Sequence, residues 1–211
     1  MNKKDCSFSI VMTVYDQARQ LEVCLPAFLA ANYEPGYEVI VVDESSTDDT
    51  DDVLKLLKQS YPQLYTTFLP KPNPNVTRRK LALSIGIKAA KNEWVIMTDI
   101  ENTPDSSDWL SSLAEVTDST TEAVAGYFTK KGLRLETFED VSQAEALAVK
   151  AERSKRKPGS GKTMKYANGC YDFIAVRRSK AYDLLKYFEH DVGALRLLRL
   201  RMSILASHSF S

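Results

Sequence analysis

The chain has 211 residues, of which 44% are hydrophobic and 27% are charged, a composition that predicts one globular domain with a sizeable core. Its 28 Lys and Arg residues balance 28 Asp and Glu residues, but the acidic excess falls in residues 1–144 and the basic excess in residues 145–211. An acidic front argues against a nucleic-acid-binding protein, whereas the basic back could face phosphates, anionic lipid or the acidic half. No apolar run approaches the roughly 20 residues that cross a bilayer, so we expect no transmembrane helix.

Cysteine and histidine residues are few and widely spaced. Cys6, Cys24 and Cys170 form an odd set, and the polar start of the chain does not predict a signal peptide. We therefore expect reduced thiols in a cytoplasmic protein. Since His190 and His208 are the only imidazole ligands, a zinc site of the usual His and Cys kind is not expected.

The chain begins with a predicted strand, a helix and a second strand. Residues 8–14 are apolar and predict a buried strand that runs into a polar turn. Apolar residues at helical spacing over residues 21–29 predict a helix, although Pro26 argues against one unbroken helix. After a turn at residues 34–36, residues 37–42 predict the second strand.

This second strand ends in Asp43 and Glu44. The hydroxyl and carboxylate groups of residues 45–48 follow, which is typical of the start of a helix. The apolar positions of this helix are Val53, Leu56 and Leu57.

The next segment predicts a strand, a loop and a helix. Residues 65–69 predict a weaker strand, and the proline-rich residues 70–74 predict a loop. A helical pattern runs over residues 76–91, with an apolar face formed by Leu81, Ile85 and Ala89. Three cations, Arg78, Arg79 and Lys80, lie at its start, where the helix dipole disfavours positive charge. An anion nearby would explain them.

Residues 94–98 are the apolar run around which the chain is organised, and they predict a strand buried on both faces. Asp99 and Glu101 follow where this strand emerges, and ligands bind at the carboxyl ends of strands in open α/β sheets. If the chain stays extended, both carboxylates point to the same side and offer two hard oxygen ligands. The pattern predicts a site for a divalent cation and a phosphate-bearing substrate.

The rest of the chain continues the alternation of strands and helices, with a helix at 108–116, a strand at 123–128, a helix at 141–152, a strand at 172–176 and helices at 179–188 and 191–206. This alternation predicts an α/β, Rossmann-like fold with a mostly parallel sheet and helices on both faces. Residues 151–164 predict a basic loop. Within it, Gly159-Ser160-Gly161-Lys162-Thr163 is not a phosphate loop, because Arg156 replaces the required Gly and no apolar strand precedes it.

Three features occur together: an early strand running into a polar turn, Val41-Val42-Asp43-Glu44-Ser45-Ser46-Thr47-Asp48, and Thr98-Asp99-Ile100-Glu101 with Pro104 and Asp108-Trp109-Leu110 after it. Together they resemble the family 2 inverting glycosyltransferases of the GT-A type. The resemblance covers residues 7–116 closely and continues loosely to about residue 180. It implies a single GT-A domain, 1–211, with a nucleotide-sugar donor half (1–116) and an acceptor half (117–211).

The resemblance also implies roles for residues of the donor half. Thr13 and Tyr15 would lie in the segment that walls the nucleotide base. Asp43 or Glu44 would contact the base or ribose. Another possibility for these two acids is that they only favour the dipole of the following helix.

Asp99 and Glu101 stand in the family's Asp-x-Asp position, where the carboxylates face the ribose and a Mg2+ or Mn2+ ion that bridges the donor diphosphate. The departing nucleoside diphosphate builds negative charge, which the metal offsets. Arg78 or Arg79 would help to hold the nucleotide, although both could also be surface charges. This chain departs from the family with Glu101 in place of Asp, and also with Ser45 and Ser84 where Gly and Asn are common.

The general base is the role that the resemblance assigns least directly. The family supplies it from an acidic pair late in the domain, and residues 187–191 are the only counterpart here. Asp191 is the first candidate and Asp172 the second, since Asp172 opens a strand beside Asn168-Gly169. Asp191 could instead only favour a helix dipole, and His190 is interpreted as a surface histidine.

These features predict a glycosyltransferase of polysaccharide biosynthesis. It would move a sugar from a nucleotide-diphosphate donor, with UDP-sugars favoured, to a hydroxyl of a glycan or lipid-linked glycan. One alternative is a non-catalytic module that binds nucleotide-sugar or a partner. A nucleotidyltransferase is a third interpretation, but it would carry a Gly-rich loop where this chain has Tyr15-Asp16-Gln17-Ala18.

The basic run 195–202 is compatible with a helix at the inner face of the membrane. Its three arginines scatter around the helix axis, however, and do not form one polar face. Packing against the domain or against a second copy is the alternative.

Overall fold

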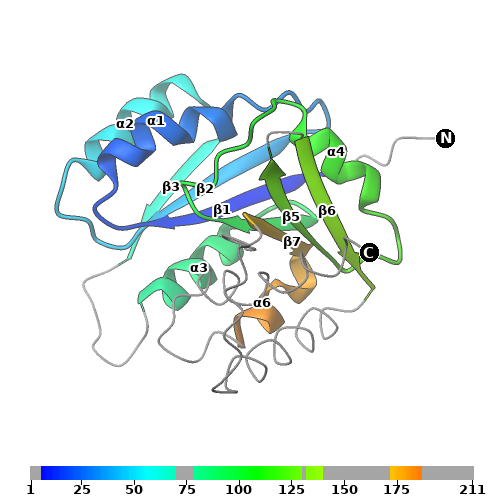
Figure 1. Ribbon diagram of the computed structural model, residues 1–211. Coiled ribbons are helices and arrows are strands. Elements are labelled where there is room, and N and C mark those ends of the chain that lie inside the picture. Colours follow the sequence, from blue (N-terminus) through cyan, green and yellow to red (C-terminus); the bar gives the residue numbers. More distant parts are fainter. Residues whose placement is uncertain (1–5, 70–77, 130–131, 140–171, 187–211) are drawn as a thin grey trace, which may run out of the picture.

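The computed structural model describes residues 6–69, 78–129, 132–139 and 172–186. Within these residues, seven strands form a single sheet in the order β3-β2-β1-β4-β7-β5-β6, with helices on both faces (Figure 1). The predicted α/β class is therefore confirmed.

Four parallel strands form one half of the sheet: β3 (Leu64–Phe68), β2 (Tyr37–Asp43), β1 (Phe8–Val14) and β4 (Trp94–Thr98). All residues of β1 and β4 are buried, which explains their predominantly apolar sequences. The chain moves outward from β1 through β2 to β3 and then returns to β4 on the other side of β1. This reversal of direction creates a crevice at the carboxyl ends of β1 and β4, where open α/β sheets bind ligands.

The other half of the sheet is antiparallel and consists of β7 (Phe173–Arg177), β5 (Ala123–Thr129) and β6 (Gly132–Phe138). The sheet is therefore mixed, and the parallel arrangement expected from the alternation of elements holds only for β1 to β4. Strand β6 was not predicted, because its burial alternates irregularly and it lies at the sheet edge. Gly132 begins it with a φ of 114°, a left-handed conformation that glycine adopts easily.

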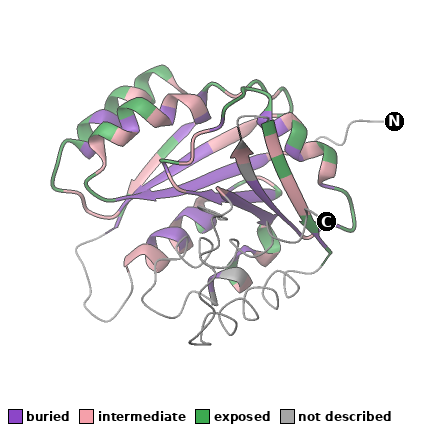
Figure 2. Cartoon of the chain, viewed as in Figure 1, coloured by how far each residue is buried: buried purple, intermediate pink, exposed green. Residues whose placement is uncertain are grey.

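Five helices cover the sheet in the described residues: α1 (Ala18–Leu29), α2 (Thr50–Ser60), α3 (Arg78–Ala89), α4 (Trp109–Val116) and α6 (Arg178–Lys186). The buried side chains of α1, α2 and α4 pack with one face of the sheet, and those of α3 and α6 pack with the other. Figure 1 shows α1 and α2 above the sheet and α3 and α6 below it. Figure 2 shows that the central strands lie buried between these two layers.

Helix α1 is continuous through Pro26, contrary to the expectation of an interrupted helix. A proline at this position removes one hydrogen bond to the carbonyl group of Glu22. Glu22 is exposed, so water can satisfy that carbonyl group and the helix tolerates the proline. Four residues on its inner face are buried, as the spacing predicted: Leu21, Leu25, Phe28 and Leu29.

The buried faces of α2 and α3 differ from the sequence predictions. In α2, Leu54 is buried and Leu56 is 66% exposed, which makes the assignment of Leu56 to the apolar face wrong. In α3, the most buried residues are Ala82, Leu83, Gly86 and Ile87. The predicted residues of α3 (Leu81, Ile85 and Ala89) pack at the margin of that core.

Several predicted segments lie outside the described residues. They are the loop at 70–74, the helix at 141–152, the basic loop at 151–164 and the helix at 191–206. The division into a donor half and an acceptor half also stays a prediction. Among the described helices, none has the length and apolar character that crossing a bilayer requires.

Candidate functional site

A cavity of about 310 Å³ lies at the carboxyl ends of β1, β2 and β4. Its lining residues come from the segments that follow these strands and from the first turn of α3: Thr13, Tyr15, Gln17, Glu44, Arg79, Asp99 and Glu101. The fold therefore brings together most of the residues predicted for the donor and metal sites. The prediction did not include Gln17, although it lies in the polar turn that the sequence placed after β1.

Asp99 and Glu101 form the acidic wall of this cavity. Ile100 between them is 1% exposed, so it anchors the segment in the core while both carboxylates line the cavity. The segment is also fastened to the start of β7. The Thr98 hydroxyl and the Asn102 amide donate to the backbone carbonyl of Asp172, at 2.7 and 2.9 Å.

The two carboxylates fit a divalent cation that shares its ligands with a substrate. They supply hard oxygen atoms, and Mg2+ is commonly bound through one or two carboxylates together with substrate phosphates. In the described part of the chain, no group of three or more His, Cys, Asp or Glu side chains could hold a metal ion by itself. A cation here would therefore complete its coordination with phosphate oxygens and water.

Arg79 supplies positive charge to the same cavity. Its guanidinium group forms an ion pair with Asp99, and both side chains are partly buried, with 28% and 23% of their surface exposed. The Nε atom of Arg79 is buried and has no hydrogen-bond partner among the described residues. A donor atom of this kind would gain from an added acceptor, such as a phosphate oxygen.

Glu44 lines the same cavity, and the positive charge of Arg79 acts on it as well. Burial raises the pKa of Glu44, while a hydrogen bond from Thr13 and the positive charges of Arg79 and Arg78 oppose that rise. Asp43, a neighbouring acid, adds to it. Glu44 is therefore a partly desolvated carboxylate, sensitive to any ligand that changes the charge nearby.

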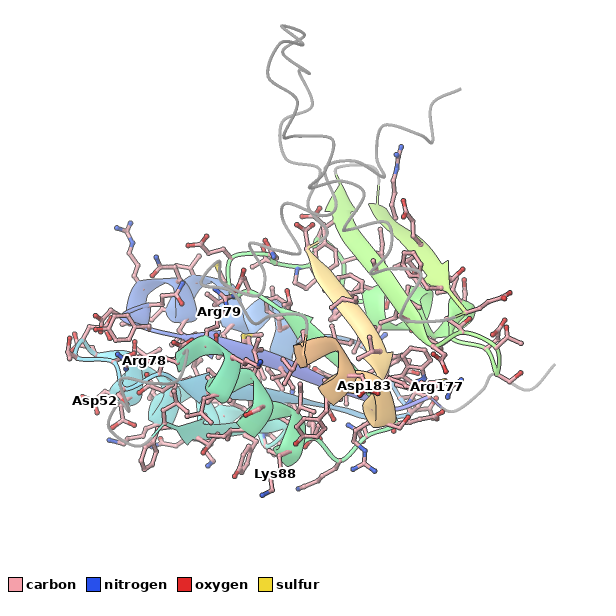
Figure 3. All side chains as sticks on the ribbon, turned by 90° about the horizontal axis from the view of Figure 1, so that it is seen from below. Asp52, Arg78, Arg79, Lys88, Arg177 and Asp183 are labelled. Carbon is pink, nitrogen blue, oxygen red and sulfur yellow. The ribbon has the colours of Figure 1, made fainter. Side chains whose placement is uncertain are left out.

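Arg78 reaches the cavity through Tyr15. Its guanidinium carbon lies 4.9 Å from the centre of the Tyr15 ring, which is a cation–π contact. Tyr15 is 46% exposed and lines the cavity, whereas Arg78 does not. Figure 3 shows Arg78 and Arg79 together at the start of α3, with Lys88 at the opposite end of the helix.

The structure separates the roles of Asp43 and Glu44. The Asp43 Oδ1 atom accepts hydrogen bonds from the Ser46 backbone N–H at 2.9 Å and the Ser46 hydroxyl at 2.6 Å. Asp43 is 9% exposed and is not among the cavity residues, whereas Glu44 is. Asp43 thus shapes the turn after β2, and its predicted contact with base or ribose stays a prediction.

Two residues that are not glycine adopt left-handed backbone conformations beside the cavity: Asp16 with a φ of 50° and Ser45 with a φ of 65°. Such a conformation costs of the order of 1 kcal/mol or more for a residue with a side chain. It accounts for the preference for glycine at the position of Ser45 that the resemblance implied. The Ser45 hydroxyl compensates by donating to the Leu69 carbonyl at 2.8 Å.

The two candidate bases have different outcomes. Asp172 is described, and its Oδ2 atom accepts a hydrogen bond from the Phe128 backbone N–H at 2.7 Å. It lies directly before β7, against the segment that carries Asp99, but it is not among the cavity residues. Asp191 lies outside the described residues. The identity of the base therefore stays a prediction.

Residues 9–185 match the family model described as glycosyl transferase family 2. A comparison with curated protein sequences gives no match. The match therefore spans nearly all of the described strands and helices and every residue that lines the cavity.

Solved structures share the fold at low sequence identity. The mannosyltransferase PcManGT from Pyrobaculum calidifontis, in complex with GDP-Man and Mn2+, has 21% identity and a TM-score of 0.56, over 90% of this chain and 49% of that chain. Glucosyl-3-phosphoglycerate synthase from Mycobacterium tuberculosis has 15% identity and a TM-score of 0.53, over 84% and 60%. Another structure of that synthase contains Mn2+, UDP and phosphoglyceric acid, with 14% identity and a TM-score of 0.50, over 82% and 56%. The chain thus spans about half the length of the first of these proteins.

Proposed function

Because the chain belongs to glycosyl transferase family 2, we propose that it transfers a sugar from a nucleotide-diphosphate donor to a hydroxyl group of a glycan or lipid-linked glycan. The observation that carries the proposal is the cavity at the carboxyl ends of β1, β2 and β4, where two acids, a partly desolvated Glu44 and Arg79 converge. This combination suits a ligand with an uncharged base at one end and a metal-bound diphosphate at the other.

In this proposal, Thr13, Tyr15 and Glu44 bind the nucleoside. Tyr15 offers an aromatic surface, Thr13 and Glu44 offer polar groups, and Arg78 supports the Tyr15 ring from one side. UDP-sugars are the favoured donors on the resemblance, and the complexes of structurally similar proteins contain GDP-Man in one case and UDP in another. Asp43 could add a contact through the carboxylate oxygen that the turn does not use.

The diphosphate lies beside Asp99 and Glu101, which would hold a Mg2+ or Mn2+ ion. When bound, the ion offsets the negative charge that builds on the departing nucleoside diphosphate. Arg79 adds a second positive charge at the same place, and its buried Nε atom gains an acceptor there. The two carboxylates alone would repel the diphosphate, so the cation and Arg79 make binding favourable.

Transfer with inversion requires a carboxylate that accepts the proton of the attacking hydroxyl within about 2.6 to 3.2 Å, or through one water. Asp191 is the first candidate and Asp172 the second. The position of Asp172 against the Asp99 segment supports its candidacy.

A cytoplasmic location is part of the same proposal, and the net positive charge of residues 145–211 would favour contact with the anionic inner face of the membrane.

Titration calorimetry with UDP and GDP tests donor binding. We expect binding with Mn2+ present, and a loss of about tenfold or more in affinity with EDTA or in Asp99→Asn. Asp105→Asn is the matched control, because Asp105 is an exposed acid in the loop that follows. Equal affinity in every condition would refute the metal site.

A transfer assay with nucleotide sugars then separates an enzyme from a binding module. Sugar transfer that is lost in Asp191→Asn or Asp172→Asn, with nucleotide affinity unchanged, supports catalysis and identifies the base. The chain covers only 49% of the similar mannosyltransferase, so a module that binds the donor without transfer is the second candidate. Nucleotide binding without transfer to any acceptor would favour that candidate.

A further inference from the structure

The two loops that carry Tyr15 and Glu44 are joined by a set of hydrogen bonds. One loop runs from the end of β1 to the start of α1, and the other runs from the end of β2 to the start of α2. We call them the first loop (residues 15–18) and the second loop (residues 44–50). The bonds between them link residues about 30 positions apart in the sequence.

Asp16 ties the first loop to the second. Its Oδ1 atom accepts a hydrogen bond from the Thr47 backbone N–H at 2.7 Å and another from the Thr47 hydroxyl at 3.3 Å. Its own backbone N–H donates to the Ser46 hydroxyl at 2.9 Å. That hydroxyl in turn donates to Asp43 at the end of β2. Asp16 is therefore connected through the second loop to the sheet.

Asp48 makes the reciprocal connection from the second loop to the first. Its Oδ2 atom accepts a hydrogen bond from the Ala18 backbone N–H at 3.0 Å. This N–H lies in the first turn of α1, where backbone donors have no partner within the helix. Its Oδ1 atom accepts the Thr50 backbone N–H at 3.1 Å. The Thr50 hydroxyl accepts a hydrogen bond from the Gln17 N–H at 3.2 Å. The hydrogen bond between the Thr50 side chain and Asp48 is the largest of the effects that lower the pKa of Asp48.

Each aspartate thus satisfies backbone donors of the other's loop. These hydrogen bonds offset the energetic cost of the left-handed backbone conformations at Asp16 and Ser45. Without the bonds, the two loops would be free to leave these conformations. Tyr15 immediately precedes Asp16, and Glu44 immediately precedes Ser45. The backbone conformation of Asp16 and Ser45 therefore helps to fix the path of the two loops that bring Tyr15 and Glu44 to the cavity.

We propose that Asp16 and Asp48 are positioning residues for nucleotide binding, which act by locking the first and second loops together so that Tyr15 and Glu44 present one binding surface. The proposal rests on the proposed function of the cavity as a donor site. Neither aspartate lines the cavity, and both are exposed, so neither contacts the nucleotide. A preorganised surface avoids the entropy that ordering two loops would otherwise take from binding.

The proposal predicts a separation between nucleotide and metal. Asp99 and Glu101 belong to a third segment, which is fastened to Asp172 and not to the two loops. Loosening the loops should therefore weaken nucleotide affinity and leave Mn2+ affinity unchanged. A general loss of structure would weaken both.

The experiment measures Mn2+ affinity by electron paramagnetic resonance and affinity for UDP and GDP, with Mn2+ present, by calorimetry. In Asp48→Ala we expect about tenfold weaker binding of the nucleotide that the wild type binds, since the charge-assisted hydrogen bond from the Ala18 N–H and those from Thr50 are lost. Mn2+ affinity should stay within about twofold. Asp52→Ala is the matched control, because Asp52 is an exposed acid of α2 whose partner is Lys55 and not the first loop.

Variants at Asp16 separate the hydrogen bond from the backbone strain. Asp16→Asn keeps an acceptor oxygen and tolerates the left-handed conformation, so we expect affinity near that of the wild type. Asp16→Gly relieves the strain but loses the acceptor, so we expect about tenfold weaker nucleotide binding. Because glycine is compatible with the local backbone, this variant also serves if an alanine variant does not fold.

Three results would overturn the proposal. Nucleotide affinity unchanged in both Asp48→Ala and Asp16→Gly would show that the loops need no lock. An equal loss of nucleotide and Mn2+ affinity would show a general structural role. No binding of either nucleotide by the wild type, with Mn2+ still bound, would instead refute the proposed donor site on which the inference rests.

Discussion

Arg79 at the start of α3 forms an ion pair with Asp99 at the end of β4, across the cavity that also contains Glu44 and Glu101. The guanidinium group is therefore paired with the Asp99 carboxylate, which the proposed function assigns to a metal ion. A metal ion and an arginine are both attracted to the ionised carboxylate, and either one, once bound, weakens the attraction of the carboxylate for the other cation. Arg79 is thus expected to oppose metal binding while it favours the diphosphate.

Arg79→Met should change the two affinities in opposite directions. We expect the protein without nucleotide to bind Mn2+ about tenfold more tightly, because a competing positive charge beside Asp99 is removed. Affinity for the nucleoside diphosphate should fall by a similar factor, because a phosphate donor is lost. Electron paramagnetic resonance measures the first change and calorimetry the second.

Lys88→Met is the control, since Lys88 is an exposed cation at the other end of α3 (Figure 3). This variant should leave both affinities unchanged. Weaker Mn2+ binding in Arg79→Met would contradict the competition between Arg79 and the metal for Asp99.

Glu44→Gln should raise thermal stability at neutral pH. Burial raises the pKa of Glu44 above its ordinary value of 4.5, so the folded state holds this proton more tightly than the unfolded state does. The contribution of Glu44 to stability is therefore fully present below pH 4.5 and is lost as the pH rises through the folded pKa. The neutral glutamine avoids that loss.

At pH 7.5 we expect the melting temperature of Glu44→Gln to exceed that of the wild type, because glutamine is neutral in this partly buried position at every pH. The difference should shrink as the pH falls toward 4.5. Thermal unfolding followed by circular dichroism across this pH range measures it. A constant difference at all pH values, or a less stable variant at neutral pH, would contradict the assignment to a desolvated carboxylate.

Gly86→Ala should destabilise the packing of α3 on the sheet. A Cβ atom at Gly86 would lie 2.4 Å from Val11 Cγ1 and 3.2 Å from Val42 Cγ2, both of them side chains of central strands. Overpacking of this kind costs about 1 to 3 kcal/mol, which outweighs the gain of up to about 1 kcal/mol in helix propensity. Chemical denaturation measures the free energy of unfolding.

The double variant Val11→Ala with Gly86→Ala tests the cause. Removing the Val11 methyl groups makes room for the new Cβ atom, so the double variant should lose less stability than the sum of the two single variants. Additive losses would show that the contact between residues 11 and 86 is not responsible.

The proposed site was largely predictable from the sequence, because strands buried on both faces are predominantly apolar and their polar residues begin where they emerge. That rule located the ends of β2 and β4, and with them Glu44, Asp99 and Glu101. The structure brings these acids to one cavity, because the carboxyl ends of parallel strands share one edge of the sheet.

Other features depended on contacts between segments far apart in the chain. Helical spacing alone could not distinguish Leu54 from Leu56 as the buried residue of α2, because the position of the sheet decides which side of the helix is covered. The antiparallel edge strand β6 was missed for a related reason, since its irregular pattern is stabilised by pairing with β5.

The local pattern of apolar and polar residues was enough to identify the buried strands and the acids that follow them, because burial acts on each strand separately. The pairing of Arg79 with Asp99, and the hydrogen bonds of Asp16 and Asp48 between two loops, follow instead from the folding of distant segments onto one another. A local pattern specifies which groups can form a hydrogen bond or an ion pair. The partner is chosen by the way in which strands β1, β2 and β4 place their carboxyl ends side by side.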